Sequence, residues 1–278
     1  MQKSGKSRIA CPISSPIEPE RAGQTGLASS QRWLNRWRHR VLSGKLTNVN
    51  EPSLKANPRF PIARAARAEF TFASFLFFAA LIYAALRPGA FSNTLAILLG
   101  MVWLGLAMFF RDPARRTPGD PGLVISAADG QVVEIVRLNE PVFLEGPALK
   151  IGVFMQLNDV HVNRAPTAGE VKYKQHVPGE FLQAFRPEAA SRNEHYFTGL
   201  ETPHGRLLVK QIAGILARRI VCSVAQDQSL ATGERLGMIK FGSRVDVFMP
   251  PNFEPLVEIG DRVRAGETPI ARIASAKG

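Results

Sequence analysis

The chain has 278 residues, of which 45% are hydrophobic and 21% are charged, so it can form one large domain or two modest ones around a sizeable core. Its net charge of +12 comes entirely from residues 1–116, which hold 17 Lys and Arg against 5 Asp and Glu, whereas residues 117–278 hold 18 of each sign. A nucleic-acid-binding domain carries basic residues on its folded surface, so this distribution argues against nucleic acid as a partner and for a membrane. Two distant cysteines, Cys11 and Cys222, exclude a disulfide framework and a zinc site with paired spacings.

The first 58 residues are rich in Ser, Pro, Arg, Gln and Asn and lack sustained apolar periodicity outside residues 31–42. This composition predicts a disordered basic extension over residues 1–58. Within it, Trp33 and Trp37 alternate with arginines in a spacing that suits a basic helix on an anionic membrane surface. A segment without any role remains the alternative.

Two uncharged apolar segments, residues 70–86 and 91–110, follow with only four residues between them. Their lengths lie within the range that spans a hydrocarbon core about 30 Å thick. We therefore expect a membrane-associated helical hairpin within residues 59–116, with Pro88 and Gly89 in its outer turn. A soluble hairpin is disfavoured because neither segment has a polar face for water; whether the hairpin spans the bilayer or inserts partly stays open.

Arginines flank the hairpin at both ends. By the positive-inside rule, both ends then lie in the cytoplasm. We expect the protein in the cell inner membrane, with the domain that follows the hairpin on the cytoplasmic side. The flanking residues are Arg59, Arg64, Arg67, Arg111, Arg115 and Arg116.

From residue 117 onward the sequence consists of short β-type runs separated by Gly, Pro and Asn. Such runs are typical of an antiparallel β domain. We predict a mainly β (α+β) fold, with an antiparallel barrel-sandwich-like domain over residues 117–278 behind the N-terminal helical hairpin. Residues 257–273 resemble the closing turn of lipoyl-type barrel-sandwich folds, in which Gly260 and Gly266 bracket a strand reversal. Residues 228–237 are expected to form a short helix or turn.

Three stretches of the β domain are candidates for chemistry: SAADG around Asp129, NDVHVNRAP around His161, and the Gly242-Ser243 pair in KFGSRVDVFMP. Taken singly, each has an ordinary structural explanation. Asp-Gly is a common turn, a histidine between valines suits a sheet surface, and a Gly-Ser pair that interrupts an alternating strand pattern suits a bulge.

In this order, and together with RNEH at residues 192–195, the stretches resemble the phosphatidylserine decarboxylase family over roughly residues 59–275. The short spacers and the hairpin resemble its compact bacterial, pyruvoyl-dependent branch. The resemblance implies that Asp129 orients His161, that His161 activates the Ser243 hydroxyl, and that Ser243 attacks the carbonyl of Gly242. Self-cleavage between Gly242 and Ser243 would then leave a pyruvoyl group, a covalent cofactor derived from Ser243.

The implied function is an autoprocessing lyase that converts phosphatidylserine in the membrane to phosphatidylethanolamine and CO2, using the ketone as an electron sink. The resemblance further implies a heterodimer of the two cleavage fragments and requires no metal. Asn193 and His195 are candidates for substrate contacts because they lie in a stretch that resembles one near the substrate in the family. Arg164 is a third candidate, because it lies three residues after His161 and could form a bidentate contact with a phosphate or carboxylate. Their structural alternatives are a surface ion pair for Arg164 and a loop with a strand start for the other two.

This sequence departs from the longer family forms at three positions, namely Asn158, where those forms have an additional histidine, and Phe241 and Arg244, which flank the cleavage dipeptide. None of the three catalytic residues is affected. Two alternatives to the main hypothesis are a membrane-anchored barrel-sandwich adaptor without catalysis and a pyruvoyl decarboxylase acting on another serine-headgroup lipid.

Overall fold

The structure, a computed structural model, describes residues 62–184, 186, 188–215, 219–240 and 243–274. The chain divides into two units, Met1–Asn48 and Val49–Gly278, and every described residue belongs to the second. The predicted disordered extension at residues 1–58 lies outside the described residues.

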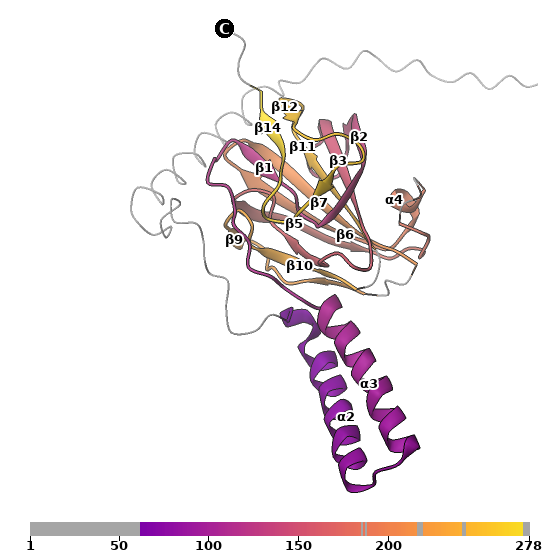
Figure 1. Cartoon of the computed structure of the whole chain (residues 1–278). Coiled ribbons are helices and arrows are strands. Elements are labelled where there is room, and N and C mark those ends of the chain that lie inside the picture. Colours follow the sequence, from indigo (N-terminus) through magenta and orange to yellow (C-terminus); the bar gives the residue numbers. More distant parts are fainter. Residues whose placement is uncertain (1–61, 185, 187, 216–218, 241–242, 275–278) are drawn as a thin grey trace, which may run out of the picture. The chain divides into compact units, whose positions relative to one another are not determined.

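The predicted helical hairpin is confirmed (Figure 1). A short 3-10 turn, η1 (Arg64–Ala66), leads into α2 (Arg67–Leu86), and α3 (Ala90–Phe109) returns. Between the two helices, Trp103 Nε1 donates a hydrogen bond of 2.8 Å to Ser74 Oγ. This bond satisfies two polar groups that would otherwise face an apolar surrounding.

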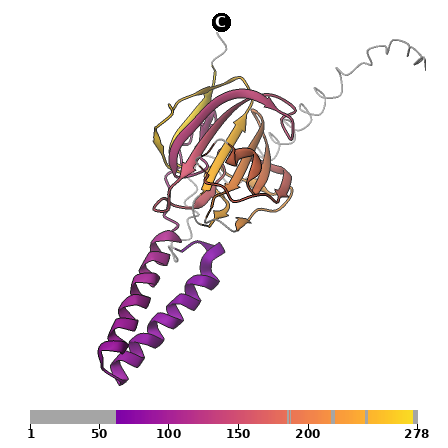
Figure 2. The same ribbon diagram turned by 90° about the vertical axis from the view of Figure 1, so that its right-hand side faces the viewer.

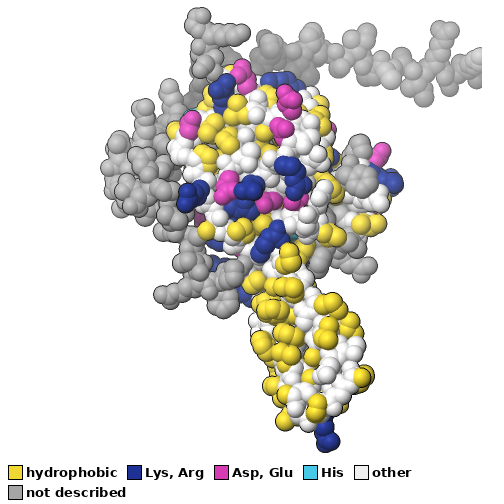
Figure 3. Space-filling model, viewed as in Figure 1, with side chains coloured by type: hydrophobic (Ala, Val, Ile, Leu, Met, Phe, Trp, Pro, Cys, Tyr) yellow, Lys and Arg dark blue, Asp and Glu magenta, His cyan; other side chains and the backbone are white. Residues whose placement is uncertain are grey.

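The surface of the hairpin is apolar. Both helices are long and apolar enough to cross a membrane, and only 6% and 11% of their most apolar windows are buried by the rest of the protein. A core helix of a soluble protein would be mostly buried. In the view of Figure 3, hydrophobic side chains cover the hairpin and charged side chains gather over the β domain. The hairpin is therefore suited to membrane association.

In the remainder of the described chain the regular secondary structure is β-strand, apart from one short helix, α4 (Ala189–Arg192). The strands are β1 (Leu123–Ile125), β2 (Gly130–Glu140), β3 (Gly146–Met155), β4 (Val162–Arg164), β5 (Gly169–Val177), β6 (His195–Thr202), β7 (Gly205–Ala213), β8 (Ile220–Cys222), β9 (Ser229–Leu230), β10 (Arg235–Ile239), β11 (Ser243–Met249), β12 (Phe253–Pro255), β13 (Arg262–Val263) and β14 (Pro269–Ile273).

The strands form one large sheet and two small ones. The large sheet has the order β13-β2-β3-β11-β7-β6-β5-β9, and the small sheets have the orders β1-β14-β12 and β4-β10-β8. Every pairing between these strands is antiparallel. Figure 2, a view turned by 90°, shows the large sheet curling around the core. The predicted mainly β, barrel-sandwich-like fold is confirmed.

One face of the central strands forms the main core. Because side chains alternate along a strand, Ile151 and Val153 of β3 share this face with Val245 and Val247 of β11 and with Val209 of β7. All of them are buried in one hydrophobic cluster with residues of the two small sheets. The central strand β11 is buried along its whole length.

The expected turns are partly confirmed. Gly260 and Gly266 have positive φ values of 105° and 77°, in the region that glycine adopts at least cost, and they bracket β13 as the barrel-sandwich pattern predicts. Residues 228–237 form the two-residue strand β9, a turn and the start of β10 instead of a helix.

The Gly242-Ser243 pair does not interrupt a single strand. Strand β10 ends at Ile239 in a three-stranded sheet, and β11 begins at Ser243 in the eight-stranded sheet. The alternating pattern on both sides of the pair therefore belongs to two strands of different sheets, and the chain changes sheets between them. Gly242 itself lies outside the described residues.

Candidate active site

Ser243 is the first residue of β11, the central strand of the large sheet. It pairs with Met155 of β3 on one side and with Ala213 of β7 on the other, and its side chain is fully buried. Its hydroxyl donates to Met155 Sδ at 3.1 Å. A thioether sulfur is a weak acceptor, so the hydroxyl is excluded from water without being held by a strong partner.

Two amide side chains near Ser243 are functional candidates that the sequence analysis did not single out. Asn163 Nδ2 donates to the same Met155 sulfur at 3.6 Å, and Gln211 Nε2 donates to Asn163 Oδ1 at 2.7 Å. Gln211 lies opposite Val245, on the core face that Ser243 also occupies. Its Oε1 is buried without a hydrogen-bond partner among the described residues. The signal in the sequence that could have identified Gln211 is the presence of a glutamine within the apolar run that forms β7.

His161 is fully buried just before β4. Its Nδ1 donates to the carbonyl oxygen of Asp159 at 2.9 Å. Because a carbonyl oxygen only accepts, this bond places the proton on Nδ1 and leaves the lone pair on Nε2. Burial lowers the pKa of His161 to about 4, and the positive charge of Arg111 acts in the same direction. The ring is therefore neutral at ordinary pH and can accept a proton.

Asp129 lies between β1 and β2 and is buried. Its Oδ2 forms an ion pair with Arg115 Nη2 at 2.7 Å, and its Oδ1 accepts the backbone N–H of Ala265 at 2.8 Å. The segment containing Asp129 runs beside β4, since the N–H of Arg164 donates to the carbonyl of Ala127 at 2.9 Å. The orienting bond described for His161 thus comes from the Asp159 backbone and not from the Asp129 carboxylate.

Arg164 is engaged in a buried ion pair. Its Nη2 contacts Asp112 Oδ1 at 2.7 Å, and its Nη1 donates to the carbonyl of Gly233 at 3.1 Å. Of the two interpretations for this residue, the ion pair is the one the geometry favours, although it is buried rather than on the surface. Asp112 lies shortly after α3, so this ion pair also connects the segment after the hairpin to the β domain.

Asn193 and His195 differ in their relation to Ser243. Asn193 Nδ2 donates to the carbonyls of Ala213 at 2.7 Å and Leu182 at 2.8 Å, and Ala213 is the strand neighbour of Ser243. His195 pairs with Ile212, which points away from the core face that Ser243 occupies. The structure therefore brings Asn193 close to the Ser243 end of β11 and directs His195 to the opposite face.

The other face of β11 carries charge. Arg244 Nε donates to Asp246 Oδ1 at 2.6 Å and its Nη2 contacts Glu134; the side chains of Arg244 and Asp246 are only 2% and 1% exposed. Gly152 of β3 makes room for this pair, because a Cβ there would lie 2.7 Å from Arg244 Nη2. Ser243 and Arg244 are adjacent in sequence but face opposite environments.

The surroundings of Ser243 fit a pyruvoyl group. Such a group keeps the three carbon atoms of a serine residue and replaces its nitrogen and hydroxyl with one keto oxygen, so it needs no additional room between Met155 and Ala213. It is uncharged, as its apolar enclosure requires. Among the described residues, no group of three or more His, Cys, Asp or Glu side chains could hold a metal ion.

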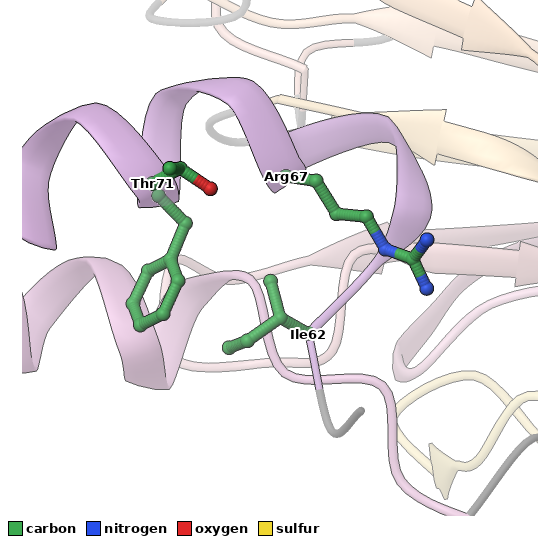
Figure 4. Close-up of a pocket in the computed structure, with 4 residues that line it drawn as sticks. Ile62, Arg67 and Thr71 are labelled. Atoms are coloured by element: carbon green, nitrogen blue, oxygen red, sulfur yellow. The ribbon is translucent and has the colours of Figure 1, made fainter. Parts of the chain in front are cut away.

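A small cavity of about 170 Å³ lies at the start of α2. It is lined by Arg67, Phe70 and Thr71 of the first turns of the helix and by Ile62 of the preceding segment. Figure 4 labels Ile62, Arg67 and Thr71. None of these residues is a predicted site residue. The candidate site therefore lies at Ser243 and His161 and not at this cavity.

Comparisons with known proteins agree with the motifs. The family model for phosphatidylserine decarboxylase matches residues 105–271. A phosphatidylserine decarboxylase proenzyme of Symbiobacterium thermophilum is 48% identical over 180 residues, which cover 63% of this chain and 84% of the relative. Proteins of the same name from Carboxydothermus hydrogenoformans and Salinibacter ruber are 44% and 45% identical, over 64% and 59% of this chain and 84% and 74% of their own lengths.

Proposed function

The chain belongs to the phosphatidylserine decarboxylase family, so its reaction is the conversion of phosphatidylserine to phosphatidylethanolamine and CO2, and we propose that it first activates itself by cleavage between Gly242 and Ser243. The observation that carries this proposal is the position of Ser243: a water-excluded hydroxyl at the first residue of a buried central strand, where the chain changes sheets. An adaptor has no need for a buried, weakly bonded serine at that point.

The proposed cleavage begins with the neutral His161. Its Nε2 accepts the proton of the Ser243 hydroxyl, the oxygen attacks the Gly242 carbonyl carbon, and the bond from that carbon to the Ser243 nitrogen breaks as the nitrogen receives the proton. The result is an ester. Loss of the Ser243 Cα proton then expels the Gly242 carboxylate and leaves dehydroalanine, and water replaces its nitrogen, which departs as ammonia.

In this scheme Asp129 is a positioning residue. It holds Arg115 and the backbone of Ala265, and its segment is hydrogen-bonded to the strand that follows His161. We expect its negative charge to fix that segment, and through it the orientation of the imidazole. Asp129→Asn should slow cleavage without abolishing it.

Once formed, the pyruvoyl group supplies an electron sink for the loss of CO2. Met155 and Ala213, the strand neighbours of Ser243, would hold the group in place, and His161 would transfer protons at Nε2. Among the candidate substrate contacts, Asn193 is best supported by its proximity to Ala213. Arg164 and His195 have less support, because one is engaged in a buried ion pair and the other faces away from the site.

The membrane hairpin brings this site to its lipid substrate. We propose that residues 59–116 form a hairpin in the cell inner membrane, that residues 117–278 form the catalytic domain on its cytoplasmic side, and that the fragments 1–242 and 243–278 remain together as a heterodimer. The apolar surface of α2 and α3 supports membrane association. The antiparallel pairing of β11 with β3 and β7 supports a stable association of the fragments.

Two measurements on purified protein test the proposal. Intact mass should show the fragments 1–242 and 243–278, and Edman degradation of the smaller fragment should fail because a keto acyl group has no free amine. The cut protein should release CO2 from phosphatidylserine in mixed vesicles. A protein that stays in one piece contradicts self-cleavage, and turnover of another serine-headgroup lipid without turnover of phosphatidylserine contradicts the substrate assignment.

A further inference from the structure

The segment before the proposed cleavage point is held by different contacts from the segment after it. Lys240 is the last described residue before Ser243. Its N–H donates to the carbonyl of Arg219 at 3.2 Å, and the N–H of Ile239 donates to the carbonyl of His161 at 3.3 Å. The segment before the proposed cleavage point is thus hydrogen-bonded to the backbone of His161, the candidate base.

The side chain of Lys240 links this segment to the membrane hairpin. The residue is only 8% exposed, and its Nζ forms an ion pair with Glu69 Oε1 at 2.5 Å. Glu69 lies in the first turn of α2, and the ring of Phe110, just after α3, lies 6.0 Å from the same ammonium group. A lysine two residues before Gly242 is therefore paired with a carboxylate on the first membrane helix.

The base of the hairpin also packs around His161. The ring of Phe109, the last residue of α3, lies 4.3 Å from the imidazole, and Arg111 Nη2 donates to the carbonyl of Asn158 at 2.5 Å. A hydrophobic cluster joins the hairpin base to β4 and β10. Its buried members are Ile62, Ala63, Ala66, Phe109, Phe110, Val160, Val162 and Met238.

We propose that Glu69 and Lys240 form a positioning pair for self-cleavage, through which the inserted hairpin sets the approach of the Gly242 carbonyl to the Ser243 hydroxyl. This inference rests on the proposed cleavage between those residues. Ser243 is fixed between two strands, so the distance between the reacting atoms depends on how the entering segment is held. Displacements of about 1 Å in such a near-attack arrangement change rates by up to about a hundredfold.

Membrane insertion then becomes a condition for rapid maturation. A helix anchored in the bilayer fixes the depth of its first turn at the interface, and hence the position of Glu69. Without the bilayer, α2 and α3 lose the apolar surrounding that their outward side chains require. The carboxylate then no longer holds Lys240 at a defined position, and the cleavage rate falls to that of a chain lacking the pair.

The test measures the time course of self-cleavage. The full chain is synthesised in a cell-free system with phosphatidylethanolamine and phosphatidylglycerol vesicles, and the fraction cut is followed by gel and intact mass. We expect Lys240→Met and Glu69→Gln to cut about tenfold more slowly than wild type. Lys240→Arg, and the reversed pair Glu69→Lys with Lys240→Glu, should restore the rate to within about threefold, and wild type without vesicles should be as slow as Lys240→Met.

Lys172→Met is the matched control, because Lys172 forms ion pairs with Glu170 and Asp227 on the β domain and none with a described residue of the hairpin. This variant should cut at the wild-type rate. A pair that only braced the fold would slow cleavage in proportion to its loss of melting temperature, whereas a positioning pair slows cleavage at temperatures where every variant is fully folded. The decarboxylation rate per cut chain should be unchanged in every variant. The inference is overturned if Lys240→Met is cleaved at the wild-type rate, or if the reversed pair is cleaved as slowly as the single variants. An uncut wild type overturns the proposed self-cleavage itself.

Discussion

The two flanks of the proposed cleavage point are held by different physical means. The downstream flank, residues 243–246, lies in the centre of the eight-stranded sheet and is buried along its whole length. The upstream flank is residues 239–240. Ile239 ends strand β10 of a three-stranded sheet, and the Lys240 side chain forms an ion pair with Glu69, whose side chain is 47% exposed. The hydroxyl is thus fixed by the main core, whereas the approach of the carbonyl depends on the hairpin.

This difference would suit a chain that is cut at the proposed point and remains assembled. After the proposed cleavage, β11 would keep its pairing with β3 and β7 from Ser243 onward, so the new terminus would stay in the core where the proposed pyruvoyl group is needed. The upstream flank would lose its covalent connection to Ser243 and would retain the contacts of its short sheet and the ion pair with Glu69. Apart from the nucleophile Ser243 itself, changes on the downstream flank should therefore affect mainly folding, and changes on the upstream flank should affect mainly cleavage.

The largest expected effect is the loss of cleavage in Ser243→Ala, because no hydroxyl remains to attack the Gly242 carbonyl. The substitution removes one oxygen whose acceptor is a weak sulfur, so the fold should persist. Intact mass should show a single full-length chain in this variant and two fragments in Ser223→Ala, which changes an exposed serine. A cut Ser243→Ala protein would assign the nucleophile to another residue.

Next in size is the effect of His161→Gln. Loss of a positioned general base typically slows a reaction by about a hundredfold to ten-thousandfold, and the glutamine amide is not basic. The same cell-free time course should show the slowing, while His176→Gln, at an exposed histidine paired with Glu194, should cut at the wild-type rate. Equal rates for both variants would remove His161 from the chemistry.

A third prediction compares the flanks through stability. Arg244→Met leaves the fully buried Asp246 without its cation, and breaking a buried pair in this way costs about 3–5 kcal/mol. Lys240→Met leaves a half-exposed Glu69 and should cost at most about 1 kcal/mol. Urea unfolding in detergent, with both variants built on Ser243→Ala so that each protein is one chain, measures the difference. Similar costs for both would contradict the contrast between the flanks.

The sequence predicted the elements well and their assembly less well. Alternation of apolar and polar residues located most of the strands, and two uncharged runs located α2 and α3, because these signals are local. Alternation on both sides of Gly242-Ser243 made the pair look like an interruption within one strand and concealed the change of sheet. No local pattern shows that residues before and after such a pair find partners in different sheets.

The candidate site shows the same limit. The positions of Ser243 and His161 followed from motifs, but the partners of Arg164 and Asp129 did not, because Asp112 and Arg115 lie before the β domain and reach them through the fold. A pairing across 52 residues of sequence leaves no periodic trace. For the same reason, the link between Lys240 and a glutamate 171 residues away was invisible to motif reasoning.

A smaller effect is expected from pH. The pKa of His161 is about 4 in the folded protein, below its ordinary value of 6.5, so the folded state binds fewer protons than the unfolded state between these values. The resulting stability is complete above pH 6.5 and is lost as pH falls toward 4. Between pH 7 and 5 the loss should be about 2 kcal/mol. Urea midpoints of Ser243→Ala should show this loss, and the addition of His161→Gln should reduce it by that amount.

The smallest predicted effect concerns Gln211, whose buried Oε1 has no hydrogen-bond partner among the described residues. Gln211→Met removes the bond from Nε2 to Asn163, worth about 1 kcal/mol, and also removes an acceptor whose burial without a partner costs about 1–3 kcal/mol. Because methionine has a similar volume and no strong polar atom, the two changes should offset, leaving stability within about 1 kcal/mol of the parent. Urea unfolding in the Ser243→Ala background measures this value. Thr198→Val, at another fully buried polar residue of the large sheet, is a matched control for removing a buried polar atom. A loss of more than about 2 kcal/mol in Gln211→Met would mean that Oε1 has a partner that stabilises the fold.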